Sequence, residues 1–428
     1  MVSGEPLNRL SATGITMSNL FLGWQPERLG QVYTADMASD PPAKGCEVRL
    51  SSRDLVPFSL FRGRSGQMIP AAKPPPPWHT PITGESRSRA LARKAISPFL
   101  EFLPYDLPDG ALGRIRRFKP DVIYSMLGSM RMVGLVAKLA RQLDLPVVPH
   151  FMDDWLATYA VPSRSLGTPL HVRCLNTAVE RLFERVPVAM AIGDMMREEY
   201  SSRFSRTFFS FMNPVDVDPS FPRDAIPNAD GFVTLVYVGG LHLGRAQMLA
   251  DIAEAVRDVA TGDCRVALDI YAPASDAPAA RRIETIAPSV RYRSSIPPDQ
   301  VRTVLDQSDV AIHVEAFDEE CAAYTRLSVS TKIPQYLAAG IPVLAYGPRT
   351  LASCRYVHDT GSGVHVGTRD RMDLREAVRA LAASENLRRE LGYRGWQRAR
   401  ECHDAGRVRD HFRDVLASAA GLGKAPYG

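Results

Sequence analysis

The feature that most restricts the fold of this chain is an alternation of short apolar runs with longer amphipathic runs. It occurs in two series, over about 121–214 and 232–347, which a polar, proline-rich stretch separates. Such alternation predicts parallel sheets with helices on both faces, because each connection between parallel strands must cross back over the sheet. Two series with a break between them predict two doubly wound, Rossmann-like α/β domains.

The expected elements follow from the period of the apolar residues. The first series predicts strands over 121–127, 146–151 and 186–193, a helix over 132–144, a helix that Asp194 caps, and a closing segment over 206–214. The second predicts strands over 232–240, 265–272, 309–316 and 341–347, with helices over 246–260 and 299–308.

Domain boundaries follow from the break at "PVDVDPSFPRDAIPNADG" (214–231), which has little apolar periodicity. We place the domains at residues 1–215 and 216–404. A C-terminal helix at about 405–420 can pack back on the first domain. The opening "MVSGEP" reads as the end of a first strand whose beginning is missing, and 69–81 as a proline-rich loop or spacer.

Composition is that of a soluble globular protein. The 428 residues are 45% hydrophobic and 23% charged, enough for two cores, and the apolar runs are too short to span a bilayer. The start shows no signal peptide, and the six cysteines form no C-x-x-C pair, which fits reduced thiols in a cytoplasm. The nine histidines show no metal-ligand spacing, so we expect no metal.

Positive charge is concentrated between Glu85 and Lys119, where eight Lys or Arg residues face four acidic ones. Apolar residues follow the basic ones within "SRSRALARKAISPFLEFL" (86–103). One interpretation is a solvated helix face beside a core edge. The other is a patch that lies on an anionic membrane surface. Aromatic residues are not interleaved with the charges, so a nucleic-acid partner is not expected.

A strand that ends in two glycines precedes a helix in "YVGGLHLGR" (237–245). Gly239 and Gly240 let the backbone approach a phosphate closely, and the following helix offers free N–H groups. Arg245, at the start of that helix, can add charge-assisted hydrogen bonds to phosphate oxygens. An ordinary tight turn explains the same residues, and we interpret His242 as a structural hydrogen-bonding residue.

A second polar junction lies in "STKIPQYLAAGIPVLAYG" (330–347). Ser330 and Thr331 can cap a helix with their hydroxyls, and the Lys332 ammonium can meet an anion. Gln335 lies nearly one turn further on, so both side chains can point the same way. The alternative is a capped helix with a solvated lysine. We expect both junctions at carboxyl ends of strands in one doubly wound domain, where open sheets bind ligands.

A third polar cluster, in "PHFMDDW" (149–155), follows a predicted strand and is expected to point into an interdomain cleft. His150, Asp153 and Asp154 suit recognition of sugar hydroxyls or proton handling. Buried carboxylates side by side also raise one another's pKa, so a pair among apolar neighbours needs a reason. The alternative is that one aspartate caps the next helix.

The motifs of the second half resemble the donor-binding domain of retaining glycosyltransferases of the GT-B fold. They are "YVGGLHLGR", "STKIPQYLAAGIPVLAYG" and "GSGVHVGTRDRMDLREAVRAL" (361–381), and within GT-B they are similar to family four, which builds bacterial surface polysaccharides. The first half agrees. "TGITMSNLFLGW" (13–24) resembles the family's N-terminal glycine turn and the helix that follows it, and the other landmarks are "KPDVIYSMLGS", "HFMDDW", "AIGDMMREEY" and "FMNPVD". The resemblance covers nearly the whole chain except about 40–115. By itself, "GSGVHVG" reads as a turn.

The resemblance implies roles for individual residues. Arg245 and Lys332 would hold the donor's diphosphate, and His150 and Asp153 would join them in the catalytic set. Gln335 stands where the family commonly has a ribose-binding carboxylate, and the family's earlier glutamate is Leu327 here. Asp154 would belong to the acceptor or sugar pocket. The remaining donor-binding set is Gly14, Gly239, Gly240, Ser330 and Thr331. Alternative donor contacts are Glu315, Glu319 and Glu320.

The resemblance therefore predicts a metal-independent, retaining glycosyltransferase, a hexosyltransferase, without a cofactor. It would move a sugar from a nucleotide-sugar donor to a glycan or lipid-linked acceptor in polysaccharide biosynthesis, in the cytoplasm or peripherally at the inner membrane face. Two rivals share the architecture. A non-hydrolysing sugar-nucleotide epimerase would need an acid/base pair, which only the cluster at 150–154 offers. A catalytically silent sugar- or nucleotide-binding protein would fit the departures at Gln335 and Leu327.

Overall fold

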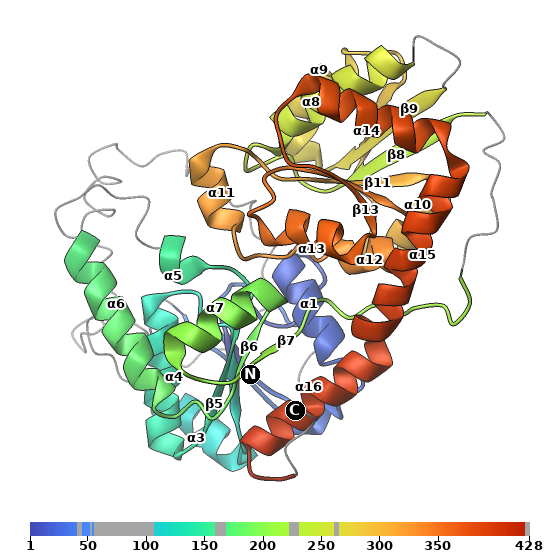
Figure 1. Cartoon of the computed structure of the whole chain (residues 1–428). Helices are drawn as coiled ribbons and strands as arrows, with labels where there is room; N and C mark the ends of the chain where they lie inside the picture. The colour runs from blue at the N-terminus through green and yellow to red at the C-terminus, as the bar shows by residue number, and fades with distance from the viewer. Residues whose placement is uncertain are drawn as a thin grey trace. The chain divides into compact units, whose positions relative to one another are not determined.

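The computed structural model describes residues 1–40, 45–51, 54, 107–158, 168–221, 231–260 and 265–423. The chain forms two compact units, whose elements are labelled in Figure 1. The first unit comprises Met1–Ala191, Arg197–Ser210 and His411–Gly428. The second comprises Ile192–Met196 and Phe211–Asp410.

The first unit contains a seven-stranded parallel sheet in the order β3-β2-β1-β4-β5-β6-β7. Its strands are β1 (Val2–Ser3), β2 (Gly30–Tyr33), β3 (Cys46–Arg49), β4 (Ile123–Ser125), β5 (Val147–Phe151), β6 (Ala189–Ala191) and β7 (Phe208–Ser210). Its helices include α1 (Ala12–Leu20), α3 (Asp109–Phe118), α4 (Met130–Leu143), α5 (Trp155–Thr158) and α6 (Thr168–Phe183). Every residue of β5 is buried, as expected of a central strand with both faces covered.

Two helices have residues in both units: α7 (Asp194–Phe204) and α16 (Ala405–Ala419). The C-terminal part of α16 belongs to the first unit. There the ring of Phe412 packs edge-on against Phe21 of the α1 C-cap and Tyr124 of β4, with centroids 5.2 and 5.5 Å away. The last helix of the chain thus contributes to the core built around the first strands.

The second unit contains a six-stranded parallel sheet in the order β10-β9-β8-β11-β12-β13. Its strands are β8 (Val233–Val238), β9 (Val266–Ala272), β10 (Val290–Ser294), β11 (Val310–Val314), β12 (Val343–Tyr346) and β13 (Gly363–Val366). Its helices are α8 (Arg245–Val259), α9 (Ala277–Glu284), α10 (Val301–Asp306), α11 (Glu319–Thr325), α12 (Ile333–Ala338), α13 (Ala352–Thr360), α14 (Arg371–Ala383) and α15 (Glu385–Cys402).

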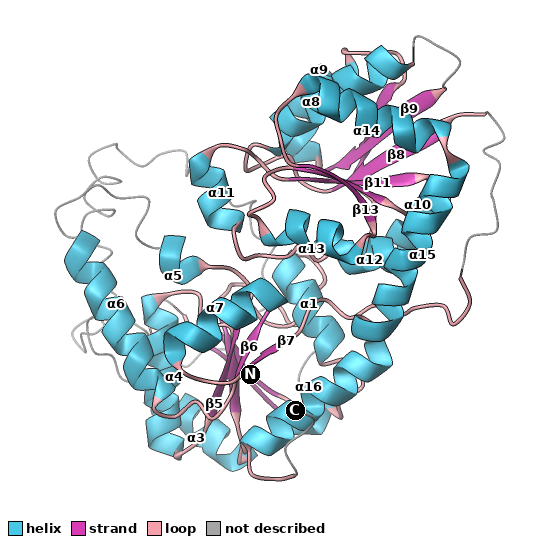
Figure 2. Cartoon of the chain, viewed as in Figure 1, coloured by secondary structure: helices cyan, strands magenta, loops and turns pink. Residues whose placement is uncertain are grey.

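The pleat of β8 shows how this sheet is buried on both sides. Leu235 and Tyr237 enter a core with side chains of α8, α9 and α14. Val236 and Val238 enter a second core with side chains of α10, α12 and α13. Successive residues of a strand point to opposite faces, so a run of apolar residues satisfies both cores at once. Figure 2 shows the strands between the two helix layers.

The predicted fold class is confirmed, and several local predictions need correction. Helix α11 intervenes between β11 and α12, so Ser330 to Lys332 follow a helix and not a strand. The segment "GSGVHVG" holds strand β13, and only Gly361 forms a turn, with a φ of 59° at the end of α13. Asp194 is the first residue of α7. The expectations for 69–81 and 86–103 fall outside the described residues.

Within the described part of the chain, no helix combines the length and apolarity that crossing a bilayer requires.

A glycine at the packing of α15 on α12 provides a test of the second core. A Cβ at Gly392 would overlap the carbonyl oxygen of Gly340, which is backbone and cannot move aside easily. We expect Gly392→Ala to lower the free energy of unfolding by about 1–3 kcal/mol through overpacking. Thermal unfolding measures this change.

The control is Gly113→Ala in α3, where a Cβ would meet nothing within 4 Å. The same substitution there should be neutral or stabilise by about 0.5–1 kcal/mol, because alanine favours a helix. Equal effects of the two substitutions would contradict the packing account.

Candidate functional site

Two glycine conformations and two hydrogen bonds define the backbone of the loop after β8. Gly239 has a φ of 154° and Gly244 a φ of 73°, conformations that side chains disfavour. The Tyr237 hydroxyl donates to Gly240 O at 2.6 Å, and Leu241 N donates to Asp276 Oδ2 at 2.8 Å. The loop backbone therefore has a defined shape before α8 begins at Arg245.

Lys332 reaches this loop from a distant part of the sequence. A Cβ placed on Gly239 would lie 2.9 Å from Lys332 Nζ, so the ammonium lies directly beside the glycine backbone. Burial, followed by the charge of Arg245, lowers the pKa of Lys332 to about 8, while Glu315 works in the opposite direction. Arg245 and Lys332, which we call the cation pair, thus lie within electrostatic range of each other beside the glycine loop.

Glu315 is the carboxylate that faces the cation pair. It follows β11 and is 3% exposed. Its Oε1 lies 3.5 Å from Arg245 Nη2 and 3.2 Å from His313 Nε2. Burial opposes its charge, but His313, Arg245 and Thr325 together outweigh burial and hold the pKa of Glu315 below its ordinary value. The site therefore contains an ionised carboxylate inside the protein.

The position of these groups in the sheet explains what they can bind. Strands β8 and β11 are neighbours, with Leu235 paired to Val310, and both end at the carboxyl edge of the parallel sheet. This edge presents the glycine loop, the start of α8 and the cation pair together. The free N–H groups predicted for this helix are not found, since Arg245 N donates to His242 O, Ala246 N to Leu241 O and Gln247 N to Gly244 O. A backbone that can be approached closely and two cations remain complementary to a phosphate or diphosphate group.

The other residues predicted around Lys332 lie at the same junction. Ser330, Thr331 and Gln335 are each half-buried. Ser330 Oγ accepts from Lys332 N at 3.5 Å, and no side-chain cap is formed at the start of α12, so the predicted hydroxyl cap is wrong. Instead, Ser330 N donates to Ser353 Oγ at 3.0 Å and fixes the segment to α13.

The three glutamates that the sequence analysis names as alternative donor contacts differ in their exposure to solvent. Glu319 and Glu320 are exposed in the first turn of α11, and Glu315 is enclosed beside Arg245. The sequence did not indicate that Glu315 would pair with Arg245. The one signal was an acidic residue at the end of an otherwise apolar strand, "DVAIHVEA". Tyr237 and Asp276, which hold the glycine loop, gave no signal at all.

The predicted cluster at 150–154 belongs to the first unit. His150 is fully buried at the end of β5, and its Nδ1 lies 2.8 Å from the Tyr124 hydroxyl. Asp154 is 1% exposed and accepts a hydrogen bond of 2.7 Å from the Tyr200 hydroxyl. Burial, followed by Asp154, raises the pKa of Tyr200, so the phenol keeps the proton it donates. Asp153 is half-buried.

Gly14 was predicted in a glycine turn before a helix, and this prediction is wrong about the local structure. It lies within the first turn of α1, where its N–H donates to the N-cap hydroxyl of Ser11 at 2.9 Å. A Cβ at Gly14 would overlap the side chain of Asn8. Asn8 in turn accepts from Leu10 N and Ser11 N and shapes the loop before the helix.

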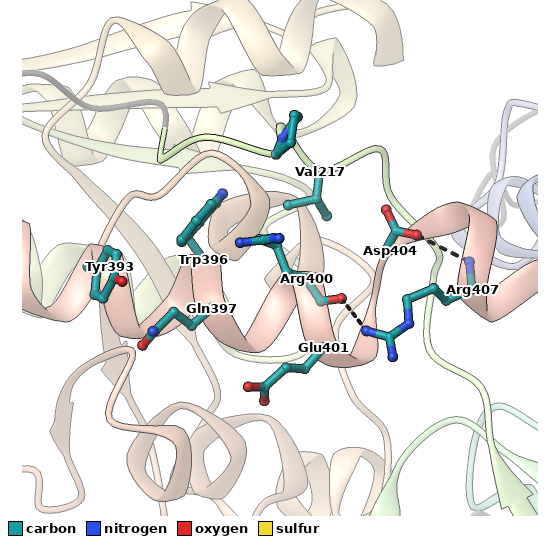
Figure 3. Close-up of a pocket in the computed structure, with 9 residues that line it drawn as sticks. Val217, Tyr393, Trp396, Gln397, Arg400, Glu401, Asp404 and Arg407 are labelled. Carbon is teal, nitrogen blue, oxygen red and sulfur yellow. Dashed lines mark hydrogen bonds between the residues drawn. The ribbon is translucent and has the colours of Figure 1, made fainter.

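A pocket of about 520 Å³ lies elsewhere in the second unit, along one face of α15 (Figure 3). The Arg400 guanidinium lies 4.8 Å from the ring centroid of Trp396, and the indole N–H of Trp396 donates to Asp218 O at 3.0 Å. None of the predicted site residues lines this pocket. It is therefore distinct from the glycine loop and the cation pair.

Across the described residues, no group of three or more His, Cys, Asp or Glu is placed to hold a metal ion.

One family model matches part of the chain. Residues 246–413 match the family model described as "Glycosyl transferase-like". No curated protein matches the chain by sequence.

Solved structures resemble the chain over nearly its whole length. Sucrose-phosphate synthase from Thermosynechococcus elongatus has a TM-score of 0.61 at 13% identity, with 99% of each chain covered. HepE from Anabaena, in complex with UDP and glucose, has a TM-score of 0.61 at 10% identity, covering 97% of this chain and 98% of that one. A glycosyltransferase from Rickettsia africae has a TM-score of 0.59 at 8% identity, covering 99% and 98%. These likenesses establish that the chain has the GT-B fold.

The buried ammonium provides a test of the site without a ligand. The pKa of Lys332 falls from its ordinary 10.5 to about 8 in the fold, so the charged form is disfavoured there. Below pH 8 the fold carries this cost, and stability rises between pH 8 and 10.5, where the unfolded chain binds more protons. We expect Lys332→Met to raise the free energy of unfolding by about 1–2 kcal/mol at pH 7.

Thermal unfolding of wild type and Lys332→Met at pH 7 and pH 9.5 measures this. The advantage of the variant should shrink at the higher pH. A constant difference, or a variant less stable at pH 7, would contradict the placement of the ammonium in a costly environment.

Proposed function

We propose that this protein is a glycosyltransferase that transfers a sugar from a nucleotide-sugar donor. The observation that carries the proposal is the convergence of Arg245 and Lys332 beside the Gly239 backbone at the carboxyl edge of the second sheet. The family match over 246–413 and the GT-B fold agree with it. HepE, which shares the fold, was solved with UDP and glucose, and we extend a UDP-type donor to this chain by analogy.

In the proposed reaction, the bond between the anomeric carbon and the donor diphosphate breaks through an oxocarbenium-like transition state. Negative charge then grows on the departing diphosphate. Arg245 and Lys332 stabilise that charge. Because these groups are already in place, they need no reorganisation as the charge develops. Gln335, in the first turn of α12, offers an amide that can both donate to and accept from ribose hydroxyls.

The finer assignments rest on the resemblance to family four. We propose retention of the anomeric configuration, a hexose as the transferred sugar, and no requirement for a metal ion. The proposed acceptor is a glycan or lipid-linked oligosaccharide in cell-surface polysaccharide synthesis at the inner membrane face. Support for the membrane surface comes from the basic residues between 86 and 119, of which the described part, α3, carries Arg114, Arg116 and Arg117.

Ligand-dependent stabilisation tests the donor class. We expect one group among UDP-, GDP-, dTDP- and CMP-sugars to raise the thermal midpoint, since a ligand that binds only the folded state stabilises it by mass action. At a concentration of about 100 times Kd the gain is about 2.7 kcal/mol. Thermal-shift measurements with each sugar nucleotide give the answer. If none of them shifts the midpoint, the chain does not bind a nucleotide sugar and the proposal fails.

Arg245 is the residue on which turnover should depend most. We expect Arg245→Ala to cost about 2–4 kcal/mol of transition-state stabilisation, because a charged hydrogen bond to the leaving diphosphate is lost. Steady-state sugar transfer, or donor hydrolysis, measures this as kcat/KM.

The matched control is Arg257→Ala on the same helix. Arg257 is 44% exposed and pairs with Asp258 at 3.1 Å. The Arg257→Ala substitution should leave kcat/KM within a factor of about two of the wild-type value, because surface ion pairs contribute little. Similar losses in both variants would show a general effect of charge on α8 and would remove Arg245 from the site.

A further inference from the structure

The position of Glu315 raises a question that the proposed function does not answer. A site that binds a diphosphate gains nothing directly from a carboxylate, because like charges repel. Yet Glu315 lies 3.5 Å from the Arg245 guanidinium and is 3% exposed. Its presence beside the cation pair therefore calls for a function other than ligand contact.

The backbone of Glu315 is fixed by the sheet. Its N–H donates to Tyr346 O of β12 at 2.9 Å, which continues the pairing of β11 with β12. Gly347 has a φ of 156°, and a Cβ there would lie 2.8 Å from Glu315 O and 3.0 Å from Glu315 Cβ. These contacts fix the backbone and the Cβ of Glu315, and the carboxylate is held by its contacts with Arg245 and His313.

The carboxylate is also closed to ligands. Its Oε1 contacts Arg245 and His313. Its Oε2 is buried and, among the described residues, has no hydrogen-bond partner. An isolated ionised carboxylate is costly to bury, so its charge must be matched by the cations that face it. Glu315 is thus too enclosed to meet a ligand directly and contacts Arg245 instead.

The groups around this cluster come from every element packed against it. They are Tyr237 of β8, Arg245 of α8, His313 of β11, Lys332 before α12, Tyr336 of α12, Cys321 of α11 and Cys354 of α13, with Asp276 facing Tyr237. Burial raises the pKa of Tyr237 to about 12 and that of Cys321 to about 11, and it raises those of Tyr336 and Cys354 further. The two tyrosines and the two cysteines stay neutral at ordinary pH. Asp276 acts on Tyr237, whereas Glu315 is the carboxylate that acts on both Arg245 and Lys332.

We propose that Glu315 is the built-in counter-ion of the cation pair: it positions the Arg245 guanidinium and lets both cations stay charged while no ligand is bound. This inference rests on the proposed function, since it takes the cation pair as the diphosphate site. When a diphosphate binds, it supplies the second and larger neutralising charge. Without Glu315, two cations would share a partly buried space alone, and Lys332 would give up its proton at lower pH.

The consequence appears in the pH dependence of ligand binding. In wild type, affinity for UDP should fall as pH rises through about 8, where Lys332 loses its proton. In Glu315→Gln, which keeps the shape and removes the charge, the midpoint of this fall should move down by about one pH unit. Glu315→Asp keeps the charge and should keep the wild-type midpoint.

The experiment is calorimetric titration of wild type and both variants with UDP between pH 6 and 9.5, with inorganic pyrophosphate as a second probe that has no base. Glu376→Gln is the control, because Glu376 is a 69%-exposed carboxylate of α14 that pairs with Arg379. UDP binding by this control variant should fall with the same pH midpoint as in wild type. A Glu315→Gln midpoint equal to that of wild type overturns the inference. If wild type binds neither probe, the proposed function fails instead.

A second comparison covers the case in which Glu315→Gln does not fold. The double variant Lys332→Met/Glu315→Gln removes one cation together with the carboxylate. If Glu315 serves as a counter-ion, the double variant should fold, because one cation fewer is left unbalanced. Its thermal midpoint should lie below that of Lys332→Met, because Arg245 has lost its partner. If the double variant also fails to fold, the carboxylate is required for structure in its own right and the inference is wrong.

Discussion

The constraint on which the site depends is that each parallel sheet is covered by helices on both faces. A strand such as β8 sends alternate side chains into two separate cores, so no part of its length is free to meet a ligand. Only the strand ends remain open. In the second unit, β8 and β11 end next to each other, and the turn after β8 can expose backbone because it is built from glycine. This edge gathers groups that are remote in sequence.

Charge balance is the second organising feature. Arg245, Lys332 and Glu315 form a small cluster in which Arg245 lowers and Glu315 raises the pKa of Lys332, while Arg245 lowers the pKa of Glu315. The lowered pKa of Lys332 means that the empty site stores an unfavourable interaction, which an incoming anion relieves. Such sites trade some stability of the fold for ligand affinity. The same electrostatics that lower the stability of the ligand-free protein are those that the proposed reaction uses.

The candidate site could be predicted in part from short motifs. Gly239, Gly240 and Arg245 stand out because the change from a strand pattern to a helix pattern at two glycines is visible in nine residues. Lys332 stands out as a basic residue beside two hydroxyl residues at the start of a predicted helix. Other predictions failed where a local pattern had two physical meanings. Gly14 resembles a turn glycine, but it lacks a side chain because Asn8 occupies that space. The hydroxyls near Lys332 resemble a cap, but α11 changes the path of the chain before them.

The sequence by itself determined the class of fold, since the periods of the apolar residues specify strands and helices and their alternation specifies parallel sheets. It also determined which residue types stand at the two polar junctions. Only the tertiary structure decided that Lys332 lies beside Gly239 and that Glu315 is enclosed against Arg245. The reason is physical: those contacts depend on the order of β8, β11 and β12 and on burial, which no local stretch of residues contains.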